Sequence, residues 1–297
     1  MKLCNNCGQA LAEPIKICPS CGQEVADGLK YVDDYKILDV VYEGCSSMVC
    51  RAIKEPDDTQ VALRLFTSTS SIDETVAQRL KVELEELQKL PEDWFVRHDA
   101  IRCSSEGKWY RVSEWLDVES WGDLFSSGRL RNLDVAYDLF HRIAAILDGL
   151  HKNGHIIPHL ILNDILILKG APGRVDVKID YKLSRFLDPK MAQPGPLQQN
   201  LLDCHPDIQK KRPLNVKSDV WSLGRIFTQI LAADLDLGNP VSAAKTGAFP
   251  KEIAILIGSM LVDDPDLRPR SMSEVADALQ RIKREHSSNK KAHRAGS

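Results

Sequence analysis

The feature that most constrains this chain is a pair of matching cysteine turns near its N-terminus. The turns read CNNCG at residues 4–8 and CPSCG at residues 18–22. Two thiolates separated by two residues can hold a tetrahedral metal ion from one tight turn, and the following glycine lets the backbone fold back toward sulfur. Two such turns supply the four ligands of a closed, structural zinc site. The predicted zinc ligands are Cys4, Cys7, Cys18 and Cys21.

The predicted zinc ribbon covers residues 1–24, followed by a linker over residues 25–30. So short a segment cannot bury a hydrophobic core, and the metal must therefore supply its folding energy. Two other interpretations remain open, a pair of disulfides and a redox-active C-x-x-C motif. Reduced cytosolic thiols disfavour the disulfides, and a redox motif is typical of a βαβ unit rather than of matched pairs.

Charge and hydropathy disfavour several classes of partner. The 297 residues carry a net charge of −3, which gives no general attraction to nucleic acid or to anionic lipid. Between Cys4 and Cys21 the only basic residue is Lys16, so we expect no nucleic-acid partner for the ribbon. No apolar run approaches the ~18 residues of a membrane span, and no apolar stretch follows the first residues as in a signal peptide. We expect a cytoplasmic protein without membrane contact.

Strands dominate the first part of the remaining chain. Residues 35–41, 49–52 and 61–66 have the composition and alternation of strands, and two more strands surround a turn at residues 104–107. Residues 72–90 carry apolar side chains at helical spacing. This part of the sequence therefore predicts five strands and one helix.

Helices dominate the second part. An apolar stripe over residues 135–150 predicts one long helix, and Ser218 is predicted to cap another. Residues 253–261 and 275–282 predict two more helices. Strands with one helix, followed by a helical half, indicate an α+β fold with two lobes. The polar, basic residues 286–297 are predicted to be disordered.

Three motifs resemble the protein-kinase superfamily, and they follow the order of that family. Residues 218–224 read SDVWSLG, close to the start of a helix in the family. Residues 263–269 read DDPDLRP and match its late D-P-x-x-R-P motif. Residues 205–207 read HPD, where the family has A-P-E. These are motifs of the scaffold, and they indicate the fold rather than catalysis.

The resemblance, to Ser/Thr protein-kinase-like domains, covers residues 31–285. It implies a five-stranded N-lobe with one helix over about residues 31–113, and a helical C-lobe over about residues 117–285. The acid of A-P-E pairs with the late arginine in the family, which implies an ion pair between Asp207 and Arg268 here.

The resemblance also locates the nucleotide positions, where several residues depart from the family. Its phosphate loop, G-x-G-x-x-G-x-V, reads YEGCSSMV here over residues 42–49, and only Gly44 remains. Arg64 replaces the lysine of V-A-I-K, with Glu83 as its implied partner, and a planar guanidinium does not place a compact ammonium between phosphates. Ser113 takes the gatekeeper position before the hinge. The implied nucleotide and magnesium contacts are Gly44, Arg64, Glu83, Glu114, Leu116, Asp164 and Asp180.

The catalytic loop departs further from the family. Where the family has H-R-D-L-K-P-x-N-I-L, residues 157–166 read IPHLILNDIL. His159 takes the place of the general base, Ile161 that of the lysine that neutralises the phosphate, and Asp164 that of the metal-binding asparagine. The D-F-G position reads D-Y-K and keeps its acid, Asp180. General-base help and charge stabilisation are therefore both weakened.

These positions favour a pseudokinase that acts as a protein-binding scaffold or regulator with little or no phosphotransfer. Two alternatives remain open. One is an active or altered-chemistry, ATP-dependent transferase like the Ser/Thr kinases, with Asp164 and Asp180 holding metal and Arg64 holding phosphate. The other is a sensor that binds a nucleotide without turnover. Structural zinc is the expected cofactor, ATP with magnesium is a candidate ligand, and proteins are the expected partners.

Overall fold

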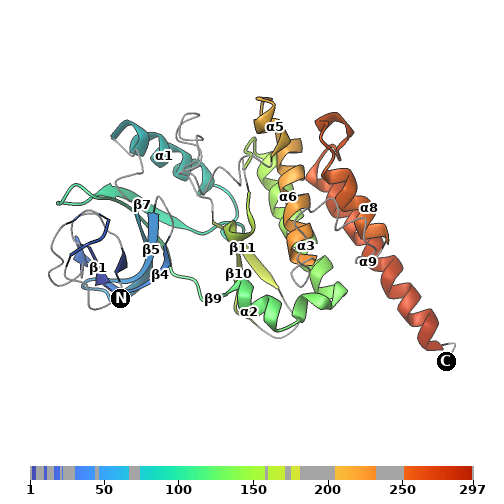
Figure 1. The fold of residues 1–297 in the computed structure, drawn as a ribbon, viewed down its shortest axis with the longest axis horizontal. Coiled ribbons are helices and arrows are strands. Elements are labelled where there is room, and N and C mark those ends of the chain that lie inside the picture. Colours follow the sequence, from blue (N-terminus) through green and yellow to red (C-terminus); the bar gives the residue numbers. More distant parts are fainter. Residues whose placement is uncertain are drawn as a thin grey trace. The chain divides into compact units, whose positions relative to one another are not determined.

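Figure 1 shows the computed structural model of the chain. The chain forms two compact units, of which one comprises the described residues up to Leu116 and the other those from Asp117 onward. No helix in this described part has the length and apolar character needed to cross a membrane. The structure describes residues 2–4, 10–11, 17–20, 22, 31–43, 47–66, 74–157, 160–170, 175–180, 205–231 and 251–295.

The first unit is built on an antiparallel sheet of six strands in the order β3-β4-β5-β6-β8-β7. Five strands were predicted, and each is present. The sixth is the two-residue strand β3, which is too short to leave a periodic pattern in the sequence. The strands are β3 (Tyr31–Val32), β4 (Tyr35–Glu43), β5 (Ser47–Lys54), β6 (Thr59–Phe66), β7 (His98–Cys103) and β8 (Trp109–Glu114).

Alternation along these strands gives the sheet an apolar face, because successive side chains of a strand point to opposite sides. On β6, Val61, Leu63 and Leu65 are buried in one hydrophobic cluster with residues of β4, β5 and β8. The predicted helix is present as α1 (Glu74–Leu87), with Leu80, Leu84 and Leu87 buried at helical spacing. Helix α1 contacts β7 of the same unit.

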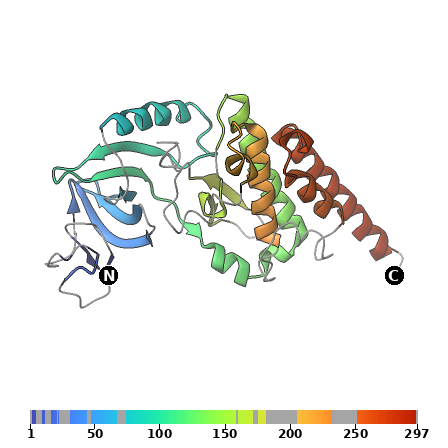
Figure 2. The same cartoon turned by 45° about the horizontal axis from the view of Figure 1, so that its top comes forward.

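The second unit combines helices with a small antiparallel sheet in the order β11-β10-β9. Helices α3, α6, α8 and α9 pack in successive pairs and lie side by side in Figures 1 and 2. Its strands are β9 (Val118–Glu119), β10 (Ile165–Leu168) and β11 (Asp176–Ile179). Its helices are α2 (Trp121–Ser126), α3 (Leu133–Lys152), α5 (Pro206–Gln209), α6 (Val216–Leu231), α8 (Lys251–Met260) and α9 (Met272–Ala295), with short 3-10 turns at Arg129–Arg131, Leu162–Asp164 and Pro265–Leu267.

Close packing between these helices forms the core of the second unit. The rings of Phe140 on α3 and Phe227 on α6 are stacked, with their centroids 4.0 Å apart. Helix α6 approaches α8 through Gly224, where an added Cβ atom would lie 2.8 Å from Cβ of Met260. A methyl group has no room at that point, so the helix needs glycine there for packing rather than for backbone freedom.

Two predictions about helix ends were wrong. Ser218 does not cap α6, because the helix already begins at Val216 and Asn215 Oδ1 accepts the Lys217 N–H at 2.9 Å. The predicted disordered tail is helical as far as Ala295, the end of α9. No proline or glycine interrupts the sequence from residue 286 to residue 295, and His286 packs edge-on against the Tyr137 ring at 6.1 Å, so composition alone understated the order of this segment.

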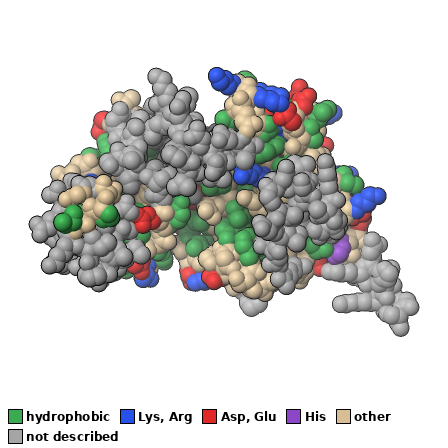
Figure 3. Space-filling model, in the orientation of Figure 1, with side chains coloured by type: hydrophobic (Ala, Val, Ile, Leu, Met, Phe, Trp, Pro, Cys, Tyr) green, Lys and Arg blue, Asp and Glu red, His purple; other side chains and the backbone are tan. Residues whose placement is uncertain are grey.

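The space-filling view in Figure 3 shows one face of the molecule, where hydrophobic, acidic and basic side chains of the described residues are interspersed. Exposed apolar side chains of the described surface include Leu38, Val41 and Tyr42 on β4, and Val82 and Ile255 on helices α1 and α8. Exposed apolar residues are ordinary on the surface of a folded protein.

Candidate functional site

The N-terminal turns bring two of the predicted zinc ligands into buried positions. A two-stranded hairpin pairs β1 (Lys2–Leu3) with β2 (Ala10–Leu11), and Cys4 follows β1 directly. Cys4 and Cys18 are 0% and 1% exposed. Gly22 has a φ of +71° and donates its N–H to the Cys18 carbonyl at 2.8 Å, which is the tight turn that the sequence predicts. Cys7, Cys21 and the linker over residues 25–30 lie outside the described residues.

In the first unit, Arg64 on β6 is the residue predicted to take the place of the kinase lysine. The residue is buried, and its Nη1 donates a hydrogen bond of 3.1 Å to Ser47 Oγ at the start of β5. A residue of the predicted phosphate loop and the residue at the predicted lysine position therefore contact each other through their side chains. Gly44 and the side chain of Glu83 lie outside what the structure describes, so the Arg64–Glu83 pair stays a prediction.

A second buried arginine lies opposite the first, and sequence reasoning missed it. Arg111 on β8 is the register partner of Arg64, and the two residues are 3% and 8% exposed. The alternation of β8 was the available signal, because it places Arg111 on the same face as Ser113 and opposite to Tyr110 and Val112. Two guanidinium groups therefore lie on neighbouring strands of the same sheet face.

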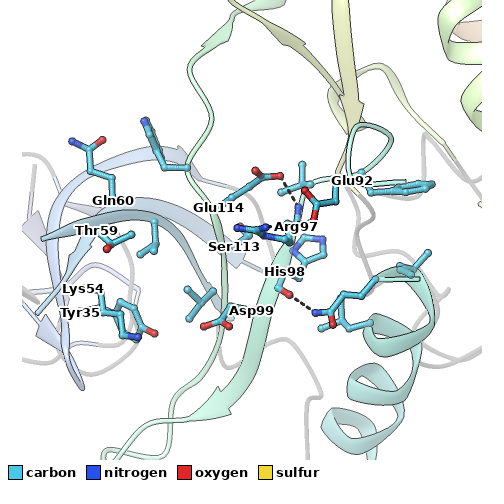
Figure 4. Close-up of a pocket in the computed structure, with 18 of the residues that line it drawn as sticks. Tyr35, Lys54, Thr59, Gln60, Glu92, Arg97, His98, Asp99, Ser113 and Glu114 are labelled. Atoms are coloured by element: carbon cyan, nitrogen blue, oxygen red, sulfur yellow. Dashed lines mark hydrogen bonds and ion pairs between the residues drawn. The ribbon is translucent and has the colours of Figure 1, made fainter. Parts of the chain in front are cut away.

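The predicted gatekeeper and hinge residues follow on β8 and just beyond it. Ser113 is buried, and its Oγ donates to the Ala62 carbonyl at 3.3 Å. The Glu114 carboxylate accepts the Arg97 N–H at 2.7 Å, and the Glu114 N–H donates to the Arg97 carbonyl at 2.9 Å, as Figure 4 shows in part. The Glu114 side chain therefore holds the segment that leads into β7, and Leu116 is half-buried.

In the second unit, the structure brings together the two acids that were predicted as metal ligands. Asp164 ends a 3-10 turn before β10, Asp180 follows β11, and the Asp180 N–H donates to the Asp164 carbonyl at 2.7 Å. Both residues are buried. Carboxylate oxygens are ligands that Mg²⁺ prefers, so the residue types fit the ion. Within the described part of the chain, however, no group of three or more potential metal-binding side chains exists.

The Asp164 carboxylate also has a structural contact. Its Oδ2 accepts the Ile161 N–H at 3.0 Å and so closes the turn of the catalytic loop. Ile161, which the resemblance aligns with the phosphate-neutralising lysine, is half-buried and follows the buried Leu160. His159, the residue at the base position, lies outside the described residues.

A buried aspartate on α6 fixes the start of the same loop. Asp219 Oδ2 accepts the Ile157 N–H at 2.8 Å and lies 2.8 Å from His151 Nε2. Burial raises the pKa of Asp219, and the hydrogen bonds from His151 and from the Ile157 N–H oppose that shift. The backbone at the predicted catalytic loop is therefore anchored from α6 and α3.

The predicted ion pair between Asp207 and Arg268 is confirmed. The guanidinium binds the carboxylate in a fork, with distances of 2.8 Å from Nη1 to Oδ2 and 3.0 Å from Nη2 to Oδ1. Its remaining N–H groups donate to the carbonyls of Val262, Lys217 and Asp263. Both partners are at most 3% exposed. The pair is therefore buried, bidentate and fully hydrogen-bonded on the arginine side.

Asp207 gains further stabilisation from Ser218, whose Oγ donates to Oδ2 at 2.7 Å. This contact is the actual role of the serine that was predicted to be a helix cap. Burial alone would raise the pKa of Asp207, but the hydrogen bonds from Arg268 and Ser218 and the Arg268 charge lower it to about 2. The carboxylate is therefore charged throughout the physiological range.

His205 begins the HPD motif and is held as a neutral imidazole. Its Nδ1 accepts the Asp207 N–H at 3.2 Å, and its Nε2 lies 3.2 Å from the Ser218 carbonyl, so Nε2 carries the proton. The ring packs against Trp221 with a centroid distance of 4.6 Å. Burial lowers the pKa of His205, with a partial counter-effect from the Ser218 carbonyl. The motif gave no signal of this role, because it depends on the partner residues in α6.

Comparisons with known proteins find relatives of similar sequence but no matching family model. No protein-family model matches the chain. The calcium/calmodulin-dependent protein kinase type II subunit delta of Oryctolagus cuniculus is 25% identical over 265 residues, which are 80% of this chain and 47% of that protein. The serine/threonine-protein kinase pkn2 of Myxococcus xanthus is 24% identical over 189 residues, which are 57% of this chain and 23% of that protein. The chain thus spans less than half the length of either relative.

Solved structures give the same class of fold. The kinase domain of PknI from Mycobacterium tuberculosis matches with a TM-score of 0.62 and 13% identity, over 84% of this chain and 97% of that domain. A point mutant of the same domain matches with a TM-score of 0.61 and 12% identity, over 84% of this chain and 96% of that domain. The two units of this chain are therefore those of a two-lobed, protein-kinase-like α+β fold, and the proteins of similar sequence include Ser/Thr protein kinases.

Proposed function

We propose that this chain is a pseudokinase, a kinase-like fold that binds protein partners and does not transfer phosphate. The observation that carries the proposal is Ile161 at the position of the phosphate-neutralising lysine, with its N–H bound by the carboxylate of Asp164. A kinase needs a cation at that point, because charge stabilisation is usually the largest catalytic term. Here an aliphatic side chain occupies the position, and one of the two metal-type acids has a structural contact.

The first unit supports the same proposal. Phosphoryl transfer relies on positioning and on charge rather than on covalent chemistry. A nucleophilic side chain therefore cannot make up for a missing cation. The Arg64 guanidinium donates to Ser47, a side chain within the phosphate-loop sequence. A general base would add only ~10²–10⁴ in rate, so His159 alone is a smaller loss than the lysine. Scaffold residues such as Asp207 and Arg268, in contrast, form a complete network.

A radiolabelled ATP assay with Mg²⁺ or Mn²⁺ tests the proposal. We expect no autophosphorylation and no transfer to generic protein substrates above background. Asp180→Ala removes the acid at the D-F-G position, and Asp277→Ala on the exposed face of α9 is the matched control. Activity that persists in the Asp277 variant and disappears in the Asp180 variant would establish an active transferase instead.

A second function, a nucleotide sensor, is favoured by the two arginines on one sheet face. Arg64 and Arg111 supply two positive charges where a kinase has one lysine and recruits magnesium for the phosphates. Such a site would bind ATP without Mg²⁺, and the expected signature is a rise in Tm with ATP that is unchanged by EDTA. Arg64→Lys keeps the charge but loses the fork, so it should reduce that rise. If ATP leaves Tm unchanged both with and without EDTA, the sensor function is excluded and the scaffold function remains.

We also propose a structural zinc ion in the N-terminal ribbon. The burial of Cys4 and Cys18 and the tight turn at Gly22 support it, because closed zinc sites place thiolates in such turns. Elemental analysis of freshly reduced protein should give one zinc per chain. Cys4→Ser and Cys18→Ser should lower that content, whereas Cys103→Ser, at an exposed position, should not. Full zinc content in the first two variants would exclude the site.

A further inference from the structure

A cavity of about 590 Å³ opens in the first unit, away from most of the positions that the kinase resemblance assigns. It is lined by the ends of β4, β5, β6 and β8, by the start of β7 and by the last turn of α1 and the residues that follow it (Figure 4). Its apolar walls include Val61, Val112, Leu84 and Phe95. The volume falls in the range of about 300–1,000 Å³ that is typical of small-ligand sites.

The hydroxyl of Tyr35 is the first sign that this cavity has a ligand. Tyr35 lines the cavity and is 1% exposed, and nothing in the described part of the chain hydrogen-bonds its Oη. A buried hydroxyl without a partner costs free energy, so its presence calls for an explanation. The neighbouring Tyr110, whose ring packs edge-on against Tyr35 at 6.0 Å, has its Oη bound to Asp33 at 2.7 Å. The Tyr110 hydroxyl thus has a partner, whereas the Tyr35 hydroxyl has none among the described residues.

The strand register places the Tyr35 side chain at the edge of the apolar face, beside polar side chains. Tyr35 pairs with Lys54, and Lys54 pairs with Thr59, so the three side chains form a row across β4, β5 and β6. Two residues further along β6, Val61 pairs with Glu114 on the same face. The cavity therefore joins an apolar floor to a polar end, and Figure 4 shows Tyr35 and Lys54 at that end.

A β-bulge brings a carboxylate to the cavity. His98 pairs with Ser113 and Ala100 pairs with Val112, which leaves Asp99 as the extra residue of β7. Bulges redirect side chains and are common beside binding sites. Asp99 lines the cavity in Figure 4, and among the described residues its carboxylate has no ion pair or hydrogen bond.

The remaining charges make the cavity acidic. Four carboxylates and two cations line it, namely Asp57, Glu92, Asp99, Glu114, Lys54 and Arg97. Glu92 lies 3.8 Å from the Arg97 guanidinium, and Glu114 accepts the Arg97 N–H. The carboxylate of Asp99 is thus available beside an apolar floor. The charge balance favours a ligand with a positive charge.

We infer that this cavity binds a ligand in which a protonated amine or guanidinium group is joined to an apolar body. The apolar body contacts Val61 and Val112, the cation pairs with Asp99, and an N–H group donates to Tyr35 Oη. A free amine and the Lys or Arg side chain of a protein partner both present this chemistry. Ser113 and Glu114 line both this cavity and the predicted nucleotide site, but Tyr35 and Asp99 belong to the cavity alone. Variants of these two residues and the ATP assay can therefore fail separately.

Titration with phenethylamine tests the site in the full chain, with saturation-transfer NMR as the readout. We expect binding that is weakened about tenfold by Asp99→Asn, which removes the charge partner, and severalfold by Tyr35→Phe, which removes only Oη. Tyr137→Phe is the matched control, because Tyr137 in the second unit also has a buried hydroxyl without a partner among the described residues. It should leave the affinity unchanged. 3-Phenylpropionate, which carries the opposite charge, should bind at least about tenfold more weakly than phenethylamine.

Unfolding midpoints without ligand separate binding from folding. Tyr35→Phe should be as stable as the parent or more stable, because it removes an unsatisfied buried hydroxyl. A variant that folds normally and loses amine binding supports the site. Equal amine affinity in the parent, Tyr35→Phe and Asp99→Asn, or equal affinity for the amine and the acid, would overturn it.

A second arm identifies the source of the cation. A capped peptide with one arginine between two leucines is titrated alongside phenethylamine, and the same two variants are measured. Tighter binding of the peptide, sensitive to Asp99→Asn, assigns the site to a protein partner. Binding of phenethylamine alone assigns it to a free amine, and binding of neither overturns the inference.

Discussion

Two regions of this molecule that the kinase resemblance identifies differ in the contacts that their residues make. Around Asp207 and Arg268 each donor of the guanidinium has an acceptor, and the pair is sealed from water. At the positions that the resemblance assigns to phosphotransfer the residue types differ from the family, and two of the described contacts, Arg64 to Ser47 and the Ile161 N–H to Asp164, lie within the chain. The difference teaches that a fold can keep its framework when the residues for its chemistry differ. The framework depends on contacts within the chain, whereas catalysis depends on contacts with a substrate.

The largest effect should come from Arg268→Ala, which leaves the Asp207 carboxylate buried without its main partner. We expect a loss of about 3–5 kcal/mol in the free energy of unfolding. Arg212→Ala is the matched control, because Arg212 Nη1 approaches the same carboxylate at 3.4 Å from a side chain that is 32% exposed, and it should cost less than about 1 kcal/mol. Denaturant titration measures both. Similar losses for the two variants would show that burial does not distinguish the pairs.

Acid should weaken the same network. Because the pKa of Asp207 is about 2 in the folded chain and 3.8 ordinarily, its contribution is complete above pH 3.8 and is lost as the pH falls toward 2. Thermal melts over that interval should therefore show a steep fall in Tm. Ser218→Ala removes one hydrogen bond to the carboxylate and should move the fall to higher pH. An unchanged acid profile in this variant would contradict the assignment.

The close contact between α6 and α8 tests the apolar part of the framework. Gly224→Ala places a Cβ atom 2.8 Å from Cβ of Met260 and should cost about 1–3 kcal/mol. Gly258→Ala on α8 meets nothing within 4 Å, so it should instead gain up to about 1 kcal/mol from the higher helix propensity of alanine. Opposite signs in the two variants confirm the close approach. A loss in both would mean that the helix pair tolerates no methyl group at either position.

The smallest effect is expected at the nucleotide positions. Ser47→Ala removes a hydrogen bond that the Arg64 guanidinium donates and should cost about 1–2 kcal/mol. Ser113→Ala, which removes a neutral bond of 3.3 Å to the Ala62 carbonyl, should cost less. Denaturant midpoints of the two variants provide the measurement. A negligible loss for Ser47→Ala would show that this hydrogen bond does not stabilise the fold.

Much of the architecture could be predicted because its signals are local. Strand alternation and helical spacing predicted the main strands and α1, α3, α8 and the start of α9, since each pattern lies within one element. Asp207 and Arg268 were paired from motifs far apart in the chain, which the kinase resemblance connected. The local patterns did not predict the helix ends correctly. Ser218 donates a hydrogen bond to Asp207 instead of capping α6, and α9 continues past His286.

The sequence by itself determined the class of fold, the cysteine turns and the absence of the usual kinase residues at His159 and Ile161, because residue identity alone decides whether a base or a cation is present. Only the tertiary structure decided that Arg111 lies opposite Arg64, that a bulge brings Asp99 to the cavity of Tyr35, and that His205 is neutral. These features depend on the register of strands and on helices that meet across long sequence separations. A side chain's partners, and hence its charge state, are set by that register rather than by its neighbours in the chain.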